Sequence, residues 1–155
     1  MASSTGDRPT EASLASSEIL CNCLAVRQAA RQITQLYDEE LAGTGLRATQ
    51  YAVLSRLSRI APATVQDLAE ALVMDRTTLA HNLKPLEREG LVVMGVAAHD
   101  RRVRQLRLTP AGTAKLNEAR VAWARAQARF EGAYGAEDAA ELRRQLARAV
   151  EAVRT

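Results

Sequence analysis

Hydrogen-bonding and cationic side chains gather in two short stretches of this 155-residue chain. Guanidinium groups, hydroxyls and amides of this kind bond to base edges and phosphates. The chemistry they indicate is non-covalent recognition of a nucleic acid, with an ordinary solvated surface as the alternative. The first stretch holds Arg76, Thr77, Thr78, His81, Asn82 and Lys84, and the second holds Asp100, Arg101, Arg102 and Arg104.

The first stretch is predicted to lie on a helix. Apolar residues at helical spacing indicate one helix that begins at Thr64 and Val65, and a turn follows at 73–75. Asp75 is a good N-cap for a second helix, which Gly90 ends. Two helices joined by a tight turn place the polar residues of the second helix where it can enter a major groove.

The second stretch is predicted to form the tip of a β-hairpin. Residues 91–94 are β-prone, and residues 104–108 alternate polar and apolar side chains. An arginine at such a tip can reach a minor groove, and Asp100 could orient one through a bidentate pair. Helix, turn, helix and hairpin together are the layout of a winged helix-turn-helix.

Pro85 lies inside the second helix. A proline there removes a backbone hydrogen bond and costs about 3 kcal/mol or more. The sequence therefore predicts a kink at Pro85 or a helix that ends near Lys84, and the i, i+3 spacing of Leu83 and Leu86 favours the kink.

Long helices flank the winged unit. The expected helices span residues 17–41, 48–60, 110–134 and 136–153. The winged unit is too small to cover the apolar stripes of the flanking helices, so we expect a homodimer. The fold class is therefore mainly α, a winged helix-turn-helix with flanking long helices that form a dimerisation domain. We expect a disordered tail at 1–13, dimerisation helices at 14–47 and 110–155, and a DNA-binding region at 48–109.

Composition and charge exclude several classes of function. A net charge of +3 permits nucleic acid as a partner without requiring it. The chain has no apolar run that could span a bilayer and no signal peptide, so we expect a cytoplasmic protein without a membrane partner. His81 and His99 are the only histidines and make no zinc-ligand cluster, and no phosphate loop, carboxylate pair or nucleophile–base set is present. We therefore expect no metal, no cofactor and no enzymatic activity.

At this point the chain resembles the MarR family of bacterial transcription regulators, over residues 17–153. The resemblance is specific at Leu68-Ala69, Met74 to Leu79, Asn82 to Val92, Asp100-Arg101-Arg102 and Leu108 to Gly112. It implies a dimer whose terminal helices form the dimer domain and whose two winged lobes bind a palindromic operator in double-stranded DNA.

The resemblance also implies roles for individual residues. Residues 76, 77, 78, 81 and 82 would face the major groove, and Asp100 would hold Arg102, the arginine of the wing. His81 departs from the family, in which arginine is common at this position, so the base preference there is open.

Cys21 and Cys23 are candidates for redox sensing. On one helix this spacing points the two thiols to nearly opposite sides, so they could neither bridge each other nor share a metal ion. Some proteins of the family sense oxidants through a cysteine in the first helix. The alternative is two small buried apolar side chains.

A small aromatic acid is the other candidate signal, because relatives often bind one between the dimer helices and the winged lobe. Arg27, Arg31, Tyr37 and Tyr51 are candidates for lining such a pocket. The alternative is that both tyrosines are core residues and both arginines are solvated.

The sequence thus predicts a dimeric, sequence-specific transcriptional regulator, a repressor that a small aromatic ligand or cysteine oxidation releases from a palindromic operator. The alternative function is a winged-helix protein-interaction module without specific DNA binding.

Overall fold

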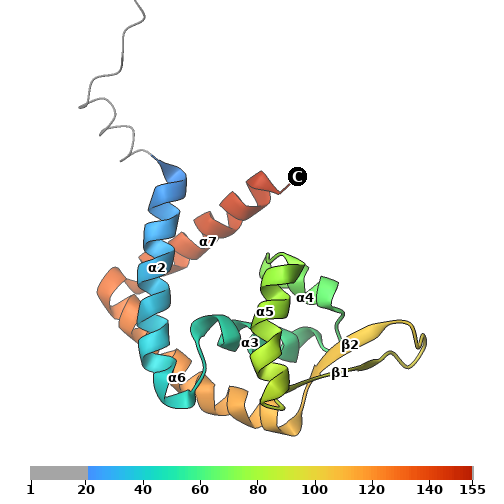
Figure 1. The fold of residues 1–155 in the computed structure, drawn as a ribbon. Helices are drawn as coiled ribbons and strands as arrows, with labels where there is room; N and C mark the ends of the chain where they lie inside the picture. The colour runs from blue at the N-terminus through green and yellow to red at the C-terminus, as the bar shows by residue number, and fades with distance from the viewer. Residues whose placement is uncertain (1–20, 155) are drawn as a thin grey trace, which may run out of the picture. The chain divides into compact units, whose positions relative to one another are not determined.

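The computed structural model describes residues 21–154, and its ribbon is drawn in Figure 1. The chain divides into two units, with the boundary inside helix α2 between Gln35 and Leu36. The tail expected at 1–13 and the helix start expected at 17 lie outside the described residues. The elements are α2 (Asn22–Leu41), the 3₁₀ turn η1 (Ala42–Thr44), α3 (Ala48–Ile60), α4 (Val65–Leu72), α5 (Arg76–Arg88), β1 (Val92–Val96), β2 (Arg104–Leu108), α6 (Pro110–Tyr134) and α7 (Ala136–Val153).

Residues 36–154 have the predicted mainly α architecture of a winged helix-turn-helix. Helices α3, α4 and α5 pack together, and β1 and β2 form a two-stranded antiparallel hairpin that projects away from them (Figure 1). Helix α6 packs against α3, and α7 packs against α6. No helix in the described part of the chain is both long and apolar enough to cross a membrane.

Short polar side chains begin three of these helices. The Thr64 hydroxyl accepts a hydrogen bond from the Asp67 amide at 3.1 Å, and the Asp67 carboxylate accepts one from the Thr64 amide at 2.9 Å. Asp75 accepts from the Thr78 amide at 2.8 Å, which confirms the predicted cap of α5. Thr109 caps α6 by accepting from the Gly112 amide at 3.0 Å. These caps satisfy backbone donors that the helices leave free.

Helix α5 continues through Pro85 to Arg88. Of the two alternatives, a helix end near Lys84 is therefore wrong, and the helix continues past the proline as the spacing of Leu83 and Leu86 favoured. Leu83 and Leu86 are both buried, on either side of the proline. Burying a leucine stabilises by roughly 1.5–3 kcal/mol, which offsets the hydrogen bond that Pro85 cannot make.

The hairpin is held to the helices by its second strand. β1 begins at Val92 and extends to Val96, two residues beyond the predicted strand, because Gly95 and Val96 pair with Gln105 and Arg104. The Leu106 amide donates to the Ala63 carbonyl at 2.7 Å, and the Ala63 amide donates back at 3.3 Å. The link between α3 and α4 thus occupies the place of a third strand and anchors the base of the hairpin.

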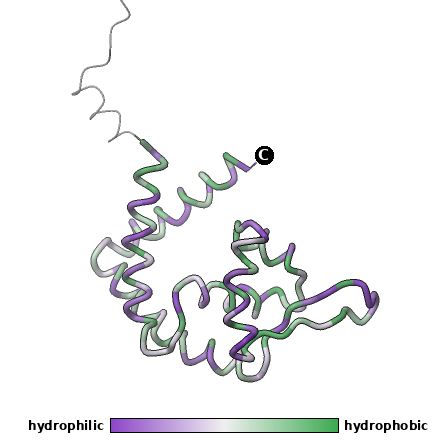
Figure 2. Tube along the Cα trace, viewed as in Figure 1, coloured by the Kyte–Doolittle hydropathy of each residue, from purple (hydrophilic) through white to green (hydrophobic). Residues whose placement is uncertain are grey.

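The core of the second unit is built mainly from leucine. Its largest fully buried side chains include Leu54, Leu57, Leu68, Leu79 and Leu106, contributed by helices and hairpin together. The described part of α2 buries only Leu41, and α7 buries only Ala139. Both helices are amphipathic, and α7 alternates hydrophilic and hydrophobic residues along its length in Figure 2.

Candidate nucleic-acid interface and adjacent cleft

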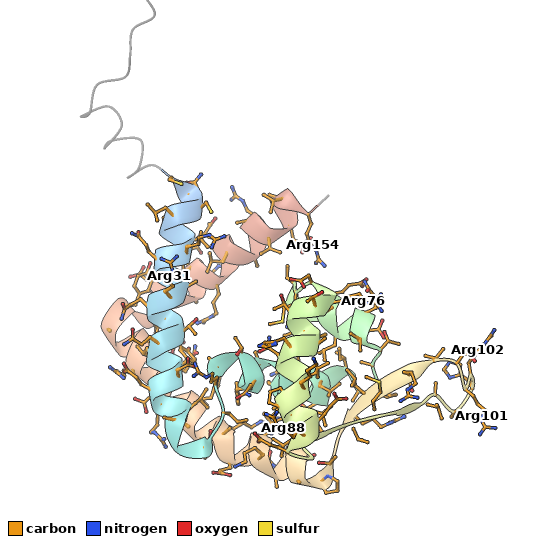
Figure 3. The ribbon with its side chains drawn as sticks, in the orientation of Figure 1. Arg31, Arg76, Arg88, Arg101, Arg102 and Arg154 are labelled. Carbon is orange, nitrogen blue, oxygen red and sulfur yellow. The ribbon has the colours of Figure 1, made fainter. Side chains whose placement is uncertain are left out.

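Helix α5 presents a polar face opposite its buried leucines. Arg76, Thr77, His81 and Lys84 are exposed, whereas Leu79 and Leu83 are buried. Figure 3 shows Arg76 at the first turn of α5, with its side chain directed away from the helix. Residues four apart on a helix share a face, so Thr77 and His81 lie together. This face offers cationic and neutral donors to a partner.

Two other predicted residues of α5 are engaged within the helix. The Thr78 hydroxyl donates to Asp75 at 2.6 Å, and the Asn82 side-chain amide donates to the Thr78 carbonyl at 2.9 Å. Hydrogen bonds to Thr78, from its side chain first and then its backbone, lower the pKa of Asp75. Asp75 therefore remains a charged cap. These local bonds leave the lone pairs of the Thr78 hydroxyl, and the second N–H and the Oδ1 of Asn82, for contact with a base.

The hairpin tip carries the predicted pair of Asp100 and Arg102. The Arg102 Nε donates to Asp100 Oδ1 and its Nη2 donates to Asp100 Oδ2, both at 3.2 Å, so the pair is bidentate. The Arg102 amide also donates to Oδ1 at 2.9 Å. These bonds, the side-chain ones first, lower the pKa of Asp100. The Arg102 side chain is still 91% exposed, so it is oriented without being covered.

Arg101 and Arg104 complete the positive tip. Both are exposed, and Figure 3 shows Arg101 and Arg102 extending from the end of the hairpin. The tip is the most hydrophilic part of the hairpin in Figure 2. Ala97 is buried beneath it and bonds through its amide to the Val103 carbonyl at 2.8 Å, which fixes the loop against the strands.

A cleft of about 550 Å³ lies beside α3, between it and α6. Tyr37 and Tyr51, two of the four predicted pocket residues, line it. Tyr51 is also 8% exposed and belongs to the core, which was the alternative expected for this residue. The Tyr37 hydroxyl donates to Gln127, and burial, followed by the charge of Glu131, raises the pKa of Tyr37.

Sequence reasoning missed most of the lining of this cleft. The Trp123 ring stacks on Tyr51 with centroids 5.9 Å apart and an interplanar angle of 16°. Arg56, Arg59 and Arg120 also line the cleft, and no carboxylate pairs with them within residues 21–154. Burial raises the pKa of Tyr51, and the charge of Arg120 opposes that shift.

One signal in the sequence could have found part of this set. Tyr51, Ser55 and Arg59 recur every four residues and therefore share one face of α3. No comparable signal joins Arg120 and Trp123 to them, because these residues come from α6. The other two predicted pocket residues, Arg27 and Arg31, are exposed and lie in the first unit, whereas every lining residue lies in the second.

Both cysteines are exposed in the single chain, unlike the buried cysteines of the alternative reading. Cys21 precedes α2, and Cys23 lies in the first turn of that helix. The Cys21 sulfur accepts a hydrogen bond from the Leu24 amide at 3.4 Å. Cys21 is thus the N-cap residue of α2 rather than a residue within the helix, and its carbonyl accepts a hydrogen bond from the Ala25 amide at 3.0 Å. Among the described residues no group of metal-ligating side chains is present.

A short helix-turn-helix, an exposed polar face on its second helix and an arginine-tipped hairpin define a winged DNA-binding protein. Comparison with known proteins supports this assignment to the winged DNA-binding proteins. Residues 44–103 match the profile of the MarR family. The MosR transcriptional regulator of M. tuberculosis, solved in complex with DNA, is 37% identical over 87% of this chain and 99% of its own, with a TM-score of 0.76.

Three further solved structures are similar. A probable transcriptional regulator from Pseudomonas aeruginosa is 29% identical over 81% of this chain and 93% of its own, with a TM-score of 0.72. The repressor CouR, bound to a 23-mer DNA duplex, is 26% identical over 84% of this chain and 92% of its own, with a TM-score of 0.77. CouR from Rhodococcus jostii RHA1 was also solved with p-coumaroyl-CoA. That structure is 22% identical over 79% of this chain and 87% of its own, with a TM-score of 0.69.

This chain belongs to the MarR family. It is a DNA-binding transcriptional regulator of a non-enzymatic family, as the sequence predicted. Family membership favours DNA binding over the alternative of a module for protein contact alone.

Proposed function

We propose that this protein is a homodimeric repressor that binds a palindromic operator and leaves it when a small aromatic acid enters the cleft beside α3. The observation that carries the DNA-binding part is the bidentate pair of Asp100 and Arg102 at the exposed hairpin tip, in one unit with the polar face of α5. Arg76, Thr77, Thr78, His81, Asn82 and Lys84 would contact the major groove and backbone, and Arg101, Arg102 and Arg104 the adjacent groove.

Exposed apolar side chains support the dimer. On α2, Leu24 and Val26 are 38% and 52% exposed, and on α7, Leu146 and Val153 are 41% and 77% exposed. Each helix is a regular amphipathic helix whose apolar side chains stay largely in water in the single chain. Burial of these side chains against a second copy would remove the free-energy cost of exposing them to water. The proposed dimerisation regions are 14–47 and 110–155, with the DNA-binding region at 48–109 between them.

The cleft supports an aromatic acid as the effector. Its volume of about 550 Å³ suits a small molecule. Tyr51 and Trp123 offer an aromatic wall for a ring, and Arg59 and Arg120 offer guanidinium groups for a carboxylate. CouR binds p-coumaroyl-CoA, an aromatic acyl thioester, which supports a ligand of aromatic acyl type here.

Cysteine oxidation is the second candidate signal. The exposure of Cys21 and Cys23 supports it, because an exposed thiol is open to oxidants. A thiol that lies near the partner chain could form an inter-subunit bridge on oxidation.

Selection from a random duplex pool tests the DNA-binding part. We expect enrichment of an inverted repeat whose half-sites lie about 10 base pairs apart or a multiple of that distance. Light scattering of the free protein tests the dimer. An enriched single half-site, or a monomer at micromolar concentration, would contradict the proposal.

Fluorescence anisotropy of the selected duplex then separates the two signals. Reduced protein is titrated with 4-hydroxybenzoate and with p-coumaroyl-CoA, and in parallel with peroxide followed by dithiothreitol. If an aromatic acid releases the protein from the duplex and Arg59→Ala weakens this effect, the result supports the cleft as the effector site. Release by peroxide alone, reversed by thiol and absent in Cys21→Ser or Cys23→Ser, would replace the aromatic acid with the redox switch.

A further inference from the structure

A second, smaller groove shares the lining residue Arg120 with the aromatic cleft. It is formed by the end of α3, the end of β2 and the first half of α6, and it has a volume of about 330 Å³. Its polar lining consists of Ser58, Arg107, Thr113, Asn117 and Arg120, and no carboxylate is among its lining residues. The groove is therefore locally positive.

Three of these side chains have hydrogen-bond donors to offer. Neither Arg107 nor Arg120 pairs with a carboxylate within residues 21–154. Arg120 donates one bond to Asn117 Oδ1 at 2.9 Å, which leaves its other N–H groups. The Asn117 Nδ2 group donates no hydrogen bond in the described part of the chain.

The hydroxyls of Ser58 and Thr113, unlike the two guanidinium groups and the amide, offer no free donor to the groove. Ser58 donates to the Ser55 carbonyl at 2.8 Å, and Thr113 donates to the Thr109 carbonyl at 3.2 Å. Their hydrogens are engaged in the helices, so they line the groove without offering free donors. The donor set is thus two planar guanidinium groups and one amide, which matches an anion with several acceptor oxygens.

We propose that this groove binds a phosphate group, either as inorganic phosphate or on a small phosphorylated molecule. A volume of about 330 Å³ holds more than a phosphate, which leaves room for a small organic substituent against Leu108 and Leu116.

The groove is coupled to the aromatic cleft because Arg120 lines both. A carboxylate in the cleft and a phosphate in the groove would both engage the Arg120 guanidinium, so the two ligands compete for it. Phosphate therefore weakens binding of an aromatic acid. This coupling rests on the proposed function of the cleft, whereas phosphate binding itself does not.

The chain offers a matched set of variants. Arg107 lines only the groove, Arg59 lines only the cleft, and Arg120 lines both. All three side chains are exposed, so their replacement by alanine leaves the core unchanged. The unfolding temperature of each variant is measured in phosphate and in chloride at equal ionic strength, with ³¹P line broadening as a direct readout of binding. Glycerol 2-phosphate replaces inorganic phosphate in a second arm, to distinguish the two sources.

We expect phosphate to stabilise the wild type and Arg59→Ala saturably, and to give Arg107→Ala and Arg120→Ala only the small, unsaturable effect of a kosmotropic anion. Tighter binding of glycerol 2-phosphate assigns the site to a phosphorylated molecule, and equal or weaker binding assigns it to free phosphate. If phosphate shifts the unfolding temperature of the wild type and of Arg107→Ala equally, the groove is not a phosphate site, and this conclusion does not depend on what the cleft binds.

Two further measurements test whether phosphate weakens binding in the cleft and whether the groove instead holds a phosphate of DNA. Phosphate should weaken 4-hydroxybenzoate binding, read from Trp123 fluorescence, by at least about fivefold in the wild type and not in Arg107→Ala. Unchanged affinity would overturn the coupling alone. If Arg107→Ala weakens DNA binding and lowers its salt dependence, the groove instead holds a DNA phosphate, and the proposal of a separate ligand site fails.

Discussion

Gly112 lies so close to Leu91 that a β-carbon on residue 112 would come within 1.9 Å of the Leu91 carbonyl oxygen. The same carbonyl accepts a hydrogen bond from the Thr109 amide at 3.0 Å. The first turn of α6 is thus seated directly on the backbone that leads into β1. This contact joins the hairpin to the long helix that lines the cleft.

Replacing Gly112 with alanine should destabilise the protein severely. The added methyl group meets backbone that cannot rotate away, and overpacking of this kind costs typically 1–3 kcal/mol or more. Gly132→Ala is the matched control, because it lies in the same helix with nothing within 4 Å of its β-carbon. That change should stabilise by roughly 0.5–1 kcal/mol. Thermal unfolding measures both, and similar midpoints for the two variants would contradict the close contact.

Arg102→Ala should weaken operator binding about tenfold or more, because an oriented guanidinium at the tip is lost. Asp100→Asn should weaken binding less, since it removes only the orienting charge. In the Arg102→Ala background the Asp100→Asn change should add nothing to that loss. Anisotropy titrations at several salt concentrations measure the cycle, and additive effects would show that Asp100 acts independently of Arg102.

The cap of α5 should become pH-sensitive only in acid. Hydrogen bonds to Thr78 lower the folded-state pKa of Asp75 below its ordinary value. A carboxylate with a lowered folded pKa stabilises above its unfolded pKa, and this contribution is lost as the pH falls through the folded pKa. The unfolding temperature of Asp75→Ala should therefore lie below that of the wild type by a constant margin at neutral pH, and the margin should shrink in acid below about pH 4. A margin that shrinks already between pH 7 and 5 would contradict the assignment.

Val73 adopts a left-handed conformation with φ of 54° at the end of α4, and it is 58% exposed. A β-branched residue is strained there, by roughly 1–2 kcal/mol. Val73→Asn should therefore raise the unfolding temperature, because asparagine tolerates this region. Val121→Asn is the control, since Val121 is 62% exposed within regular α6 and gains nothing from the change. Equal shifts in the two variants would contradict backbone strain as the cause.

The amino-acid sequence by itself determined the elements whose causes are local. Caps at Thr64, Asp75 and Thr109 act across three residues, so the starts of α4, α5 and α6 were readable. Asp100 and Arg102 are two residues apart: the hairpin tip alone predicted that Asp100 orients an arginine, and the resemblance to the MarR family singled out Arg102. Short sequence separation makes such bonds nearly independent of the rest of the fold.

Only the tertiary structure decided the features that join distant segments. The cleft brings Arg59 on α3 together with Arg120 and Trp123 on α6, and no periodicity within one helix reveals such a meeting. The local penalty of Pro85 left a kink and a helix end both open, and the burial of Leu86 in the folded core decided that α5 continues. Side chains of one helix share a period that can be read from the sequence, whereas the partner that they meet is set by how whole elements pack.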